Sequence, residues 1–270
     1  MAKHFNAMKK LLLAMAFAAL AFSPASGAGC TILANGQDGS PLMLIGDECD
    51  TPLPPASTFK VPLAVIGFDA GILTGPDEPA WPYKAEYAAT RDMWKVTTTP
   101  KSWMTDSVLW YSRLIVAELG AERFAAAVAN LDYGNADVSG DPGADNGMTR
   151  SWLNSSLQIT PNAQLDFIGQ LYGETLPVRV EAQRQAKALL PVFTAGDWQV
   201  RGKTGTAYER HANGNYNYDG QIGWFVGWAQ KGDAVVTFVS VDRMGASPAA
   251  GPAIRDRLLQ SLPELLEGYP

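Results

Sequence analysis

Two residues near position 60 have the types and the spacing for nucleophilic chemistry. Ser57 and Lys60 lie three residues apart in Ser57-Thr58-Phe59-Lys60, so a helix would place them on one face, within side-chain reach of each other. A serine hydroxyl is a weak nucleophile until a neighbouring base removes its proton. Lysine can be that base only as a neutral or chemically modified amine, because its reference pKa is about 10.4. The pair therefore predicts a serine nucleophile activated by lysine.

Other common catalytic machinery is not evident in the sequence. The chain has two histidines, His4 and His211. His211 alone cannot assemble a zinc site or, without close partners, an obvious Ser-His-Asp triad. The sequence also lacks a glycine-rich loop of the Walker or dinucleotide-binding pattern. An enzyme without a bound metal, whose serine is activated by something other than histidine, is the chemistry that remains.

Three further motifs raise the significance of Ser57 and Lys60. A Ser-x-x-Lys pair arises by chance about once in a chain of this length. Here it is followed, in order, by Ser107-Val108-Leu109, Tyr133-Gly134-Asn135 and Lys203-Thr204-Gly205. A Lys-Thr-Gly is expected by chance in only about 0.06 of such chains and a Tyr-Gly-Asn in about 0.02. Their joint, ordered occurrence indicates one functional set.

Helical elements must position the first motifs. Residues 57–71 carry apolar side chains at helical spacing and end at a glycine. A second helix is predicted over 107–119, with Asp106 as its N-cap and Gly120 at its end. A third begins at Thr160-Pro161 and ends at Gly173, with threonine as the cap and proline as the first residue. The Gly-, Asp- and Asn-rich stretch 133–149 predicts a long surface loop.

Strands at both ends of the chain must supply the rest of the scaffold. Apolar alternation and turn residues predict strands over 31–34, 41–45, 198–203, 221–230 and 234–242. The strand 198–203 ends at the Lys-Thr-Gly motif, and an amphipathic helix is expected over 251–266. Trp224 and Trp228 are expected to pack in the sheet core. This order predicts an α+β fold: a central antiparallel sheet built from both termini, flanked by helices, with a mainly helical region inserted between its strands.

The N-terminus has the layout of a secretory signal peptide. Three lysines precede an apolar run from Leu11 to Phe22, and small residues follow it up to Ala28. An uncleaved membrane anchor is the alternative, but about 12 apolar residues fall short of the roughly 20 that span a bilayer. We therefore predict a signal peptide over 1–28 and one catalytic domain over 29–270.

Charge and cysteine content narrow the partners and the compartment. The net charge of -6 and the pI near 5.0 disfavour nucleic acid and anionic membranes as partners and fit a small-molecule substrate better. Cys30 and Cys49 lie on a predicted hairpin that brings their sulfurs together. In an oxidising compartment they would form a disulfide, which contributes about 3 kcal/mol to stability in the chain-entropy model.

The motif set resembles the penicilloyl-serine transferase superfamily and, within it, the class D, oxacillinase-type, serine β-lactamases. The resemblance spans essentially the whole mature chain. It includes Pro-Ala-Ser-Thr-Phe-Lys at 55–60 and Ser-Trp-Leu-Asn-Ser-Ser-Leu-Gln-Ile at 151–159. The class A alternative is weakened because no Ser-Asp-Asn stands at 107–109.

The resemblance implies how Lys60 becomes a base. In class D enzymes the equivalent lysine carries a carbamate (N6-carboxylysine) formed with carbon dioxide, and no other cofactor takes part. A neutral amine attacks carbon dioxide, and the product is an anionic base held by hydrogen bonds. Trp152 corresponds to the tryptophan that contacts this lysine, and its indole N–H is a suitable donor.

The resemblance also implies roles for the other motif residues. Ser107 would relay a proton to the departing ring nitrogen, and the amides of Ser57 and Thr206 would form an oxyanion hole. The substrate is expected to contact Lys203 and Thr204, which hold its carboxylate, and also Gly205, Leu109 and Tyr133. Arg255 is expected to grip the carboxylate with two hydrogen bonds, although Arg257 is an alternative. Leu109 departs from the valine that many class D enzymes have, which bears on turnover and substrate range.

The predicted function is a periplasmic β-lactamase that hydrolyses penicillins and related antibiotics through an acyl-enzyme on Ser57. Two related functions are alternatives. A cell-wall transpeptidase or carboxypeptidase would share the acylation residues but release the drug slowly. A β-lactam sensor domain would be acylated and stay acylated, but such receptors need transmembrane helices.

Overall fold

The computed structural model describes residues 29–211, 213–246 and 249–269. Within these ranges six antiparallel strands form one sheet in the order β2-β1-β6-β5-β4-β3. The strands are β1 (Gly29–Asn35), β2 (Pro41–Gly46), β3 (Val192–Ala195), β4 (Trp198–Arg210), β5 (Tyr216–Lys231) and β6 (Ala234–Gly245). β1 pairs with β6 from Gly29 opposite Asp242 to Asn35 opposite Val236. Early and late segments therefore share one sheet, which confirms the predicted architecture.

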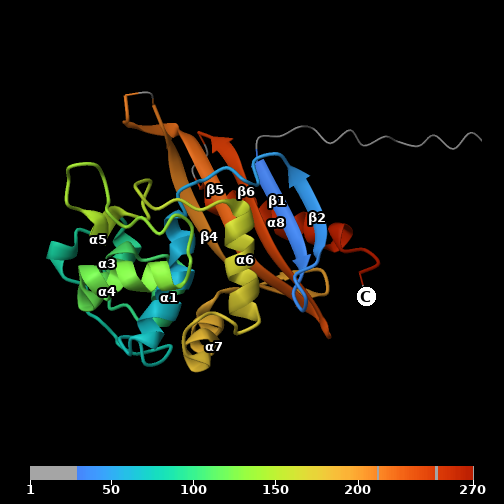
Figure 1. Cartoon of the computed structure of the whole chain (residues 1–270), viewed down its shortest axis with the longest axis horizontal. Coiled ribbons are helices and arrows are strands. Elements are labelled where there is room, and N and C mark those ends of the chain that lie inside the picture. Colours follow the sequence, from blue (N-terminus) through green and yellow to red (C-terminus); the bar gives the residue numbers. More distant parts are fainter. Residues whose placement is uncertain (1–28, 212, 247–248, 270) are drawn as a thin grey trace, which may run out of the picture.

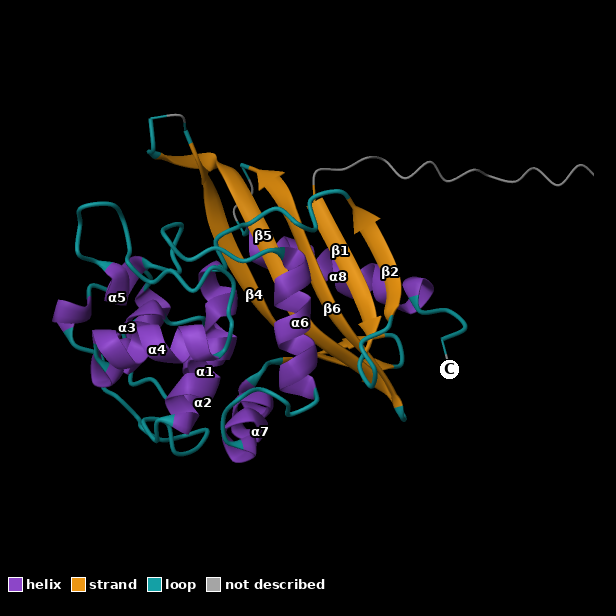
Figure 2. Ribbon diagram, viewed as in Figure 1, coloured by secondary structure: helices purple, strands orange, loops and turns teal. Residues whose placement is uncertain are grey.

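Helices cover both faces of the sheet. Figure 1 shows α8 on one face and α6 on the other, with the remaining helices gathered beside the sheet. The α-helices are α1 (Lys60–Asp69), α2 (Pro100–Asp106), α3 (Leu109–Leu119), α4 (Ala121–Asn130), α5 (Gly147–Arg150), α6 (Pro161–Tyr172), α7 (Val180–Leu189) and α8 (Ala250–Leu265). The 3-10 helices are η1 (Ala56–Phe59), η2 (Ala85–Tyr87) and η3 (Asp92–Trp94). The two layers of helix sandwich the sheet, as Figure 2 makes clear.

The central strands are buried on both sides. Trp224 and Val226 of β5 belong to the larger core, which the sheet shares with α1, α3, α4 and α6. Phe225, between them, faces the opposite way and packs in a second core with Ile254 and Leu258 of α8. Successive side chains of a strand point to opposite faces, so one strand contributes to both cores. Trp224 and Trp228 are core residues, as predicted.

The N-terminal hairpin carries the predicted disulfide. β1 and β2 pair with Cys30 opposite Gly46, and the chain then turns to bring Cys49 back to β1. Cys30 and Cys49 are bonded, with their Cα atoms 5.1 Å apart. The predicted signal peptide, residues 1–28, lies outside the described residues. In the part of the chain that the structure describes, no helix has the length and apolar character to cross a membrane.

Several predicted boundaries are wrong. The helix predicted over 57–71 divides into the 3-10 helix η1 and the α-helix α1, which starts at Lys60 and ends at Asp69. Ser107 does not begin a helix capped by Asp106: Asp106 is the last residue of α2, and α3 begins at Leu109 with Val108 as its N-cap. The overlooked start signal is Thr99, whose hydroxyl accepts a hydrogen bond from Ser102 N in a capping box at the start of α2. A full helix therefore precedes the motif, and Ser107 lies in the turn between two helices.

The Lys-Thr-Gly motif does not end its strand. β4 continues to Arg210, and Gly205 pairs with Trp224 of β5 in the middle of the ladder. The prediction that the strand ends at this motif is therefore wrong, and Gly205 instead allows a close contact within the strand, because a Cβ there would lie 2.9 Å from Pro55 O. The short strand β3 and the helices α4 and α7 were not delimited in the sequence, and the predicted loop 133–149 contains the beginning of the short helix α5. The helices ending at Gly120 and spanning Pro161–Tyr172 are confirmed.

Candidate active site

The nucleophile candidate lies in a tight turn that several distant segments hold. Ser57 is in η1, and the preceding Ala56 has φ of +48°, a left-handed conformation that costs energy for a residue with a side chain. Ala56 N–H donates to Trp152 O at 3.0 Å, and Trp224 Nε1 donates to Pro54 O at 3.1 Å. Strain immediately before Ser57 is therefore offset by hydrogen bonds from the 151–159 segment and from β5.

A glycine brings strand β4 against this turn. A Cβ on Gly205 would lie 2.9 Å from Pro55 O, closer than Cβ atoms approach other atoms in proteins, and 3.2 Å from Thr58 N, which is a tight contact. Residue 205 must be glycine for β4 to pack against η1. The Lys-Thr-Gly motif and the Ser-x-x-Lys motif thus meet directly, as the predicted functional set requires.

A second strained turn carries Ser107. Ser107 is the C-cap of α2 and has φ of +60° and ψ of +36°. Its hydroxyl accepts a hydrogen bond from Lys203 Nζ at 3.1 Å, and the same amine donates to Thr204 O at 3.0 Å. Lys203 is only 2% exposed. Burial, followed by the positive charge of Arg255, lowers the pKa of Lys203 to about 7.

Lys60 is the second buried amine. It begins α1 and is 2% exposed. In the described part of the chain its Nζ hydrogen bond goes to Ser112 Oγ, at 3.0 Å, rather than to Ser57. The amine also lies 5.9 Å from the ring centroid of Trp103. Burial holds the pKa of Lys60 well below its ordinary value, and the positive charges of Lys203 and Arg113 lower it further.

One cavity collects most of the predicted residues. It has a volume of about 450 Å³ and lies where η1, the α2–α3 turn, β4 and the start of α8 converge. The predicted residues on its wall are Ser57, Ser107, Leu109, Thr204, Gly205, Thr206 and Arg255. Lys60 and Lys203 are buried and hydrogen-bonded nearby. The cavity thus has a nucleophile on its wall and basic groups around it.

The two candidate arginines separate clearly. Arg255, one turn into α8, lines the cavity and lies over the Phe193 ring at 5.1 Å. Arg257 pairs with Asp242 at 2.6 Å and is not among the cavity residues. Arg255 also pairs with the neighbouring Asp256 at 2.8 Å; of the two arginines, it is the one that faces the cavity.

Two predicted residues are buried away from the cavity wall. Tyr133 is 0% exposed, packs edge-on against Phe59 and donates to Gln164 Oε1 at 2.8 Å. Trp152 stacks on the ring of Phe59, with ring centroids 5.4 Å apart. Gly134 is left-handed, and a Cβ there would lie within 2.2 Å of Gln158 O. Tyr133 and Trp152 therefore pack against Phe59 of η1, the 3-10 helix that carries Ser57.

Sequence reasoning missed several residues of the site. Trp103 and Ser112 contact Lys60, and neither belongs to a motif recognised in the sequence. Arg91 and Trp94, near η3, also line the cavity. A partial signal for Ser112 was present, because a small polar residue inside the apolar face of 109–119 needs a buried partner.

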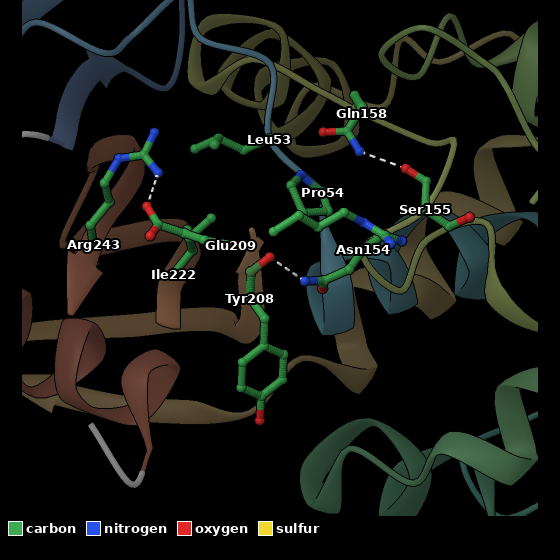
Figure 3. A pocket seen from close by; sticks show the side chains of 10 residues that line it. Leu53, Pro54, Asn154, Ser155, Gln158, Tyr208, Glu209, Ile222 and Arg243 are labelled. Atoms are coloured by element: carbon green, nitrogen blue, oxygen red, sulfur yellow. Dashed lines mark hydrogen bonds and ion pairs between the residues drawn. The ribbon is translucent and has the colours of Figure 1, made fainter. Parts of the chain in front are cut away.

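A second cavity of about 560 Å³ lies next to the first, and Tyr208 lines both. Figure 3 shows Asn154 donating to Tyr208 O and Arg243 paired with Glu209 across this second cavity. Arg243 also pairs with Glu48 at 3.1 Å. The charges of Arg243, Glu209 and Glu48 on this side are thus paired with each other, and there is no serine–lysine pair in the part of the second cavity's lining that the structure describes. Among the described residues, no group of three or more His, Cys, Asp or Glu side chains converges as metal ligands do.

Comparison with known proteins agrees with a serine acyl-transfer site on this fold. The penicillin binding protein transpeptidase domain family matches residues 29–262. β-Lactamase OXA-9 of Klebsiella pneumoniae is 40% identical over 241 residues, which cover 88% of this chain and 88% of that protein. β-Lactamase OXA-1 of Escherichia coli is 31% identical over 202 residues, covering 74% of this chain and 70% of that protein.

A solved structure narrows the class. The crystal structure of OXA-427, a class D β-lactamase, matches with a TM-score of 0.82 and 43% identity, covering 88% of this chain and 98% of that one. The chain belongs to the class D β-lactamases, as its motifs predicted.

Proposed function

We propose that this class D enzyme hydrolyses the β-lactam amide of penicillins and related antibiotics through an acyl-enzyme on Ser57. The observation that carries the proposal is a serine on the wall of an open cavity, three residues before a buried lysine with a lowered pKa. Burial in that environment favours the neutral amine, which can accept a proton. This lowered pKa supports the role of Lys60 as the base that activates Ser57.

The surroundings of Lys60 also fit the carbamate that class D enzymes carry. A neutral amine reacts with carbon dioxide, and the Lys60 amine lies near the Trp103 ring and next to the Ser112 hydroxyl group. The carbamate supplies an anionic base in place of the amine. The indole of Trp152, behind the Ser57 turn, is our candidate for an additional donor to it.

The other residues act on the charges that develop during acylation. Ser57 Oγ attacks the ring carbonyl while Lys60 receives its proton, and the amides of Ser57 and Thr206 stabilise the oxyanion. Ser107, hydrogen-bonded to Lys203, relays to the ring nitrogen the proton that Lys60 took from Ser57 as the C–N bond breaks, so that Lys60 is again free to accept a proton. The base then activates water, which hydrolyses the ester and frees Ser57.

Substrate binding relies on a cationic wall. The carboxylate next to the ring nitrogen would contact Thr204, Lys203 and Arg255. An anion at this position favours the charged form of Lys203, so binding raises the pKa of this amine from about 7. Leu109, on the same wall, affects how water reaches the base.

We also propose that the chain consists of an export signal followed by one catalytic domain. Residues 1–28 are a signal peptide that directs export to the periplasm, and residues 29–270 form the catalytic domain. The family match over 29–262 and the Cys30–Cys49 disulfide support this division, since disulfides persist in oxidising compartments.

Turnover and intact mass, measured together, test the proposal. Purified protein is mixed with a chromogenic cephalosporin and a penicillin, each in excess. We expect sustained hydrolysis with only a transient adduct on Ser57. A persistent one-to-one adduct without turnover would instead indicate a transpeptidase or a sensor.

Variants assign the roles. Ser57→Ala should abolish both turnover and adduct, whereas Ser261→Ala, at the surface of α8, should leave both unchanged. Hydrolysis that survives in Ser57→Ala would remove Ser57 from its assigned role. Activity that is indifferent to added bicarbonate and to acidification would contradict a carbamate on Lys60.

A further inference from the structure

A buried chain of three side chains ends at the Lys60 amine. Trp103 of α2 donates from Nε1 to Ser112 Oγ of α3 at 2.9 Å, and Lys60 Nζ of α1 donates to the same oxygen at 3.0 Å. Trp103 and Ser112 are both 0% exposed. Three helices therefore meet at one hydroxyl group, beneath the cavity that holds Ser57.

The hydrogen-bonding capacity of these groups decides how the chain works. An indole N–H can only donate, so Trp103 occupies one lone pair of the Ser112 oxygen. A second lone pair and the hydroxyl hydrogen remain for Lys60. Rotation of the hydroxyl hydrogen lets Ser112 accept from an ammonium or donate to a neutral amine. Lys60 thus keeps its partner in either protonation state.

The uncharged hydroxyl of Ser112 also helps to keep the pKa of Lys60 low. The charged groups that act on Lys60 are Lys203 of β4 and Arg113 of α3, and both favour the neutral amine. A carboxylate in place of Ser112 would pair with the ammonium and raise the pKa of Lys60. A hydroxyl satisfies the buried amine without stabilising its charge to that extent.

We propose that Ser112, oriented by Trp103, is a positioning residue that holds the side-chain nitrogen of Lys60, and with it the carbamate formed there, in place for proton exchange with Ser57. The inference rests on the proposed function, because it assumes that Lys60 is the base. Ser112 and Trp103 act through Lys60 and do not touch the substrate.

Matched substitutions isolate the hydroxyl group. Ser112→Thr and Ser112→Val give side chains of the same shape, of which only threonine keeps the hydroxyl. Trp103→Phe removes the N–H donor and keeps an aromatic ring. Ser151→Ala is the control, because Ser151 Oγ is buried and has no hydrogen-bond partner in the described part of the chain. For each variant, kcat/KM is measured against pH in bicarbonate-saturated buffer, together with Tm.

We expect Ser112→Val to lower kcat/KM by about 10- to 100-fold, because small misplacements of reacting groups cost about this much. The acidic limb of its pH profile should move to lower pH. The ammonium loses more than the neutral amine when the hydroxyl is removed, since hydrogen bonds to charged groups are stronger. Ser112→Thr should retain activity within a few-fold of wild type, and Trp103→Phe should show a smaller loss than Ser112→Val.

The outcomes separate this inference from the proposed function. Equal activity and equal acidic limbs in Ser112→Val, Ser112→Thr and Ser151→Ala would overturn the role of Ser112. A drop in Tm without a moved acidic limb would make Ser112 merely structural, which also overturns it. Wild-type protein that fails to hydrolyse β-lactams, or a Lys60→Ala variant that keeps full turnover, would instead refute the proposed function.

Discussion

At the level of single residues, the main feature of the site is a pair of buried lysines whose pKa values are lowered. Lys60 and Lys203 are each 2% exposed, and each donates to a serine hydroxyl, Ser112 or Ser107. Burial and like charge both favour the neutral amine. The cost is stability, because an unfolded chain would protonate these amines at a higher pH.

That cost can be measured at Lys203. Its pKa is lowered to about 7 in the folded protein, whereas an unfolded lysine titrates near 10.4. As the pH falls from about 10 to about 7, the unfolded state binds the proton first, so the folded state loses stability over this window. Relative to Lys203→Met, we expect the wild-type free energy of unfolding to fall by up to about 1.4 kcal/mol per pH unit.

Denaturant titrations at several pH values check this expectation. Lys101→Met, on the exposed surface of α2, controls for the loss of a lysine. A difference between wild type and Lys203→Met that stays constant from pH 7 to pH 10 would contradict it.

At the level of elements, the site depends on β4 packing directly against η1. Gly205 permits the contact, and Gly251 N–H donates to Thr206 Oγ1 at 3.0 Å on the side of α8. β4 is therefore held between the nucleophile turn and the helix that carries Arg255. The three elements define the cavity because no side chain separates them at residue 205.

Gly205→Ala should therefore damage the site more than the fold. Its Cβ would lie 2.9 Å from Pro55 O, which pushes β4 and η1 apart. We expect kcat/KM to fall by about 100-fold while the protein still folds. Gly169→Ala in α6 is the matched control, since its Cβ meets nothing within 4 Å; it should stabilise the helix by about 1 kcal/mol. Steady-state kinetics and thermal unfolding of both variants test this prediction. Full activity of Gly205→Ala would show that the site does not need the close contact between β4 and η1.

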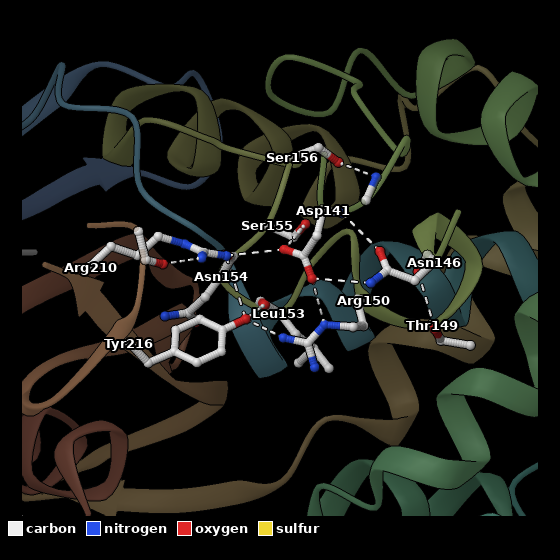
Figure 4. Close-up of polar contacts among 12 residues, drawn as sticks. Asp141, Asn146, Thr149, Arg150, Leu153, Asn154, Ser155, Ser156, Arg210 and Tyr216 are labelled. Carbon is white, nitrogen blue, oxygen red and sulfur yellow. Dashed lines mark hydrogen bonds and ion pairs between the residues drawn. The ribbon is translucent and has the colours of Figure 1, made fainter. Parts of the chain in front are cut away.

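At the level of the whole molecule, a carboxylate joins the loop region to the sheet. Figure 4 shows Asp141 at the centre of a polar cluster. Asp141 pairs with Arg150 at 2.8 Å and with Arg210 of β4 at 3.1 Å, and it accepts from Ser155 at 2.9 Å. Arg150 also donates to the hydroxyl of Tyr216 on β5. The segment that carries Trp152 is thereby tied to the β4–β5 hairpin.

Asp141→Ala should loosen this connection. Burial raises the pKa of Asp141, but hydrogen bonds from Ser155, Arg150 and Asn146 outweigh it and lower the pKa to about 2. The stabilisation is therefore fully present above about pH 4 and is lost as the pH falls towards 2. We expect Asp141→Ala to lower the free energy of unfolding by about 1–3 kcal/mol at neutral pH, with the difference from wild type narrowing below pH 4.

Chemical denaturation at neutral and acidic pH tests this, with Asp77→Ala in an exposed loop as the control. An effect no larger than that of the control, or one that does not change with acidity, would show that the cluster contributes little.

The sequence by itself determined the order of the motifs, the three-residue spacing of Ser57 and Lys60, the two-ended antiparallel sheet and the Cys30–Cys49 hairpin. These features depend on short spacings, helical or strand periodicity and turn residues, which are local properties of a chain. The predicted boundaries were wrong where the same residue type can serve two structural purposes. Glycine at 205 allows close packing within a strand, and a capping box at Thr99 starts a helix before the Ser107 turn.

Only the tertiary structure decided which distant groups surround the reacting ones. In the structure Lys203 donates to Ser107, 96 positions away along the chain, and Ser112 and Trp103 lie next to Lys60. Arg255 lines the cavity and Arg257 does not. Tyr133 is buried against Phe59. Burial and the pKa shifts that follow from it depend on every element packed around a group, so no spacing along the chain can reveal them.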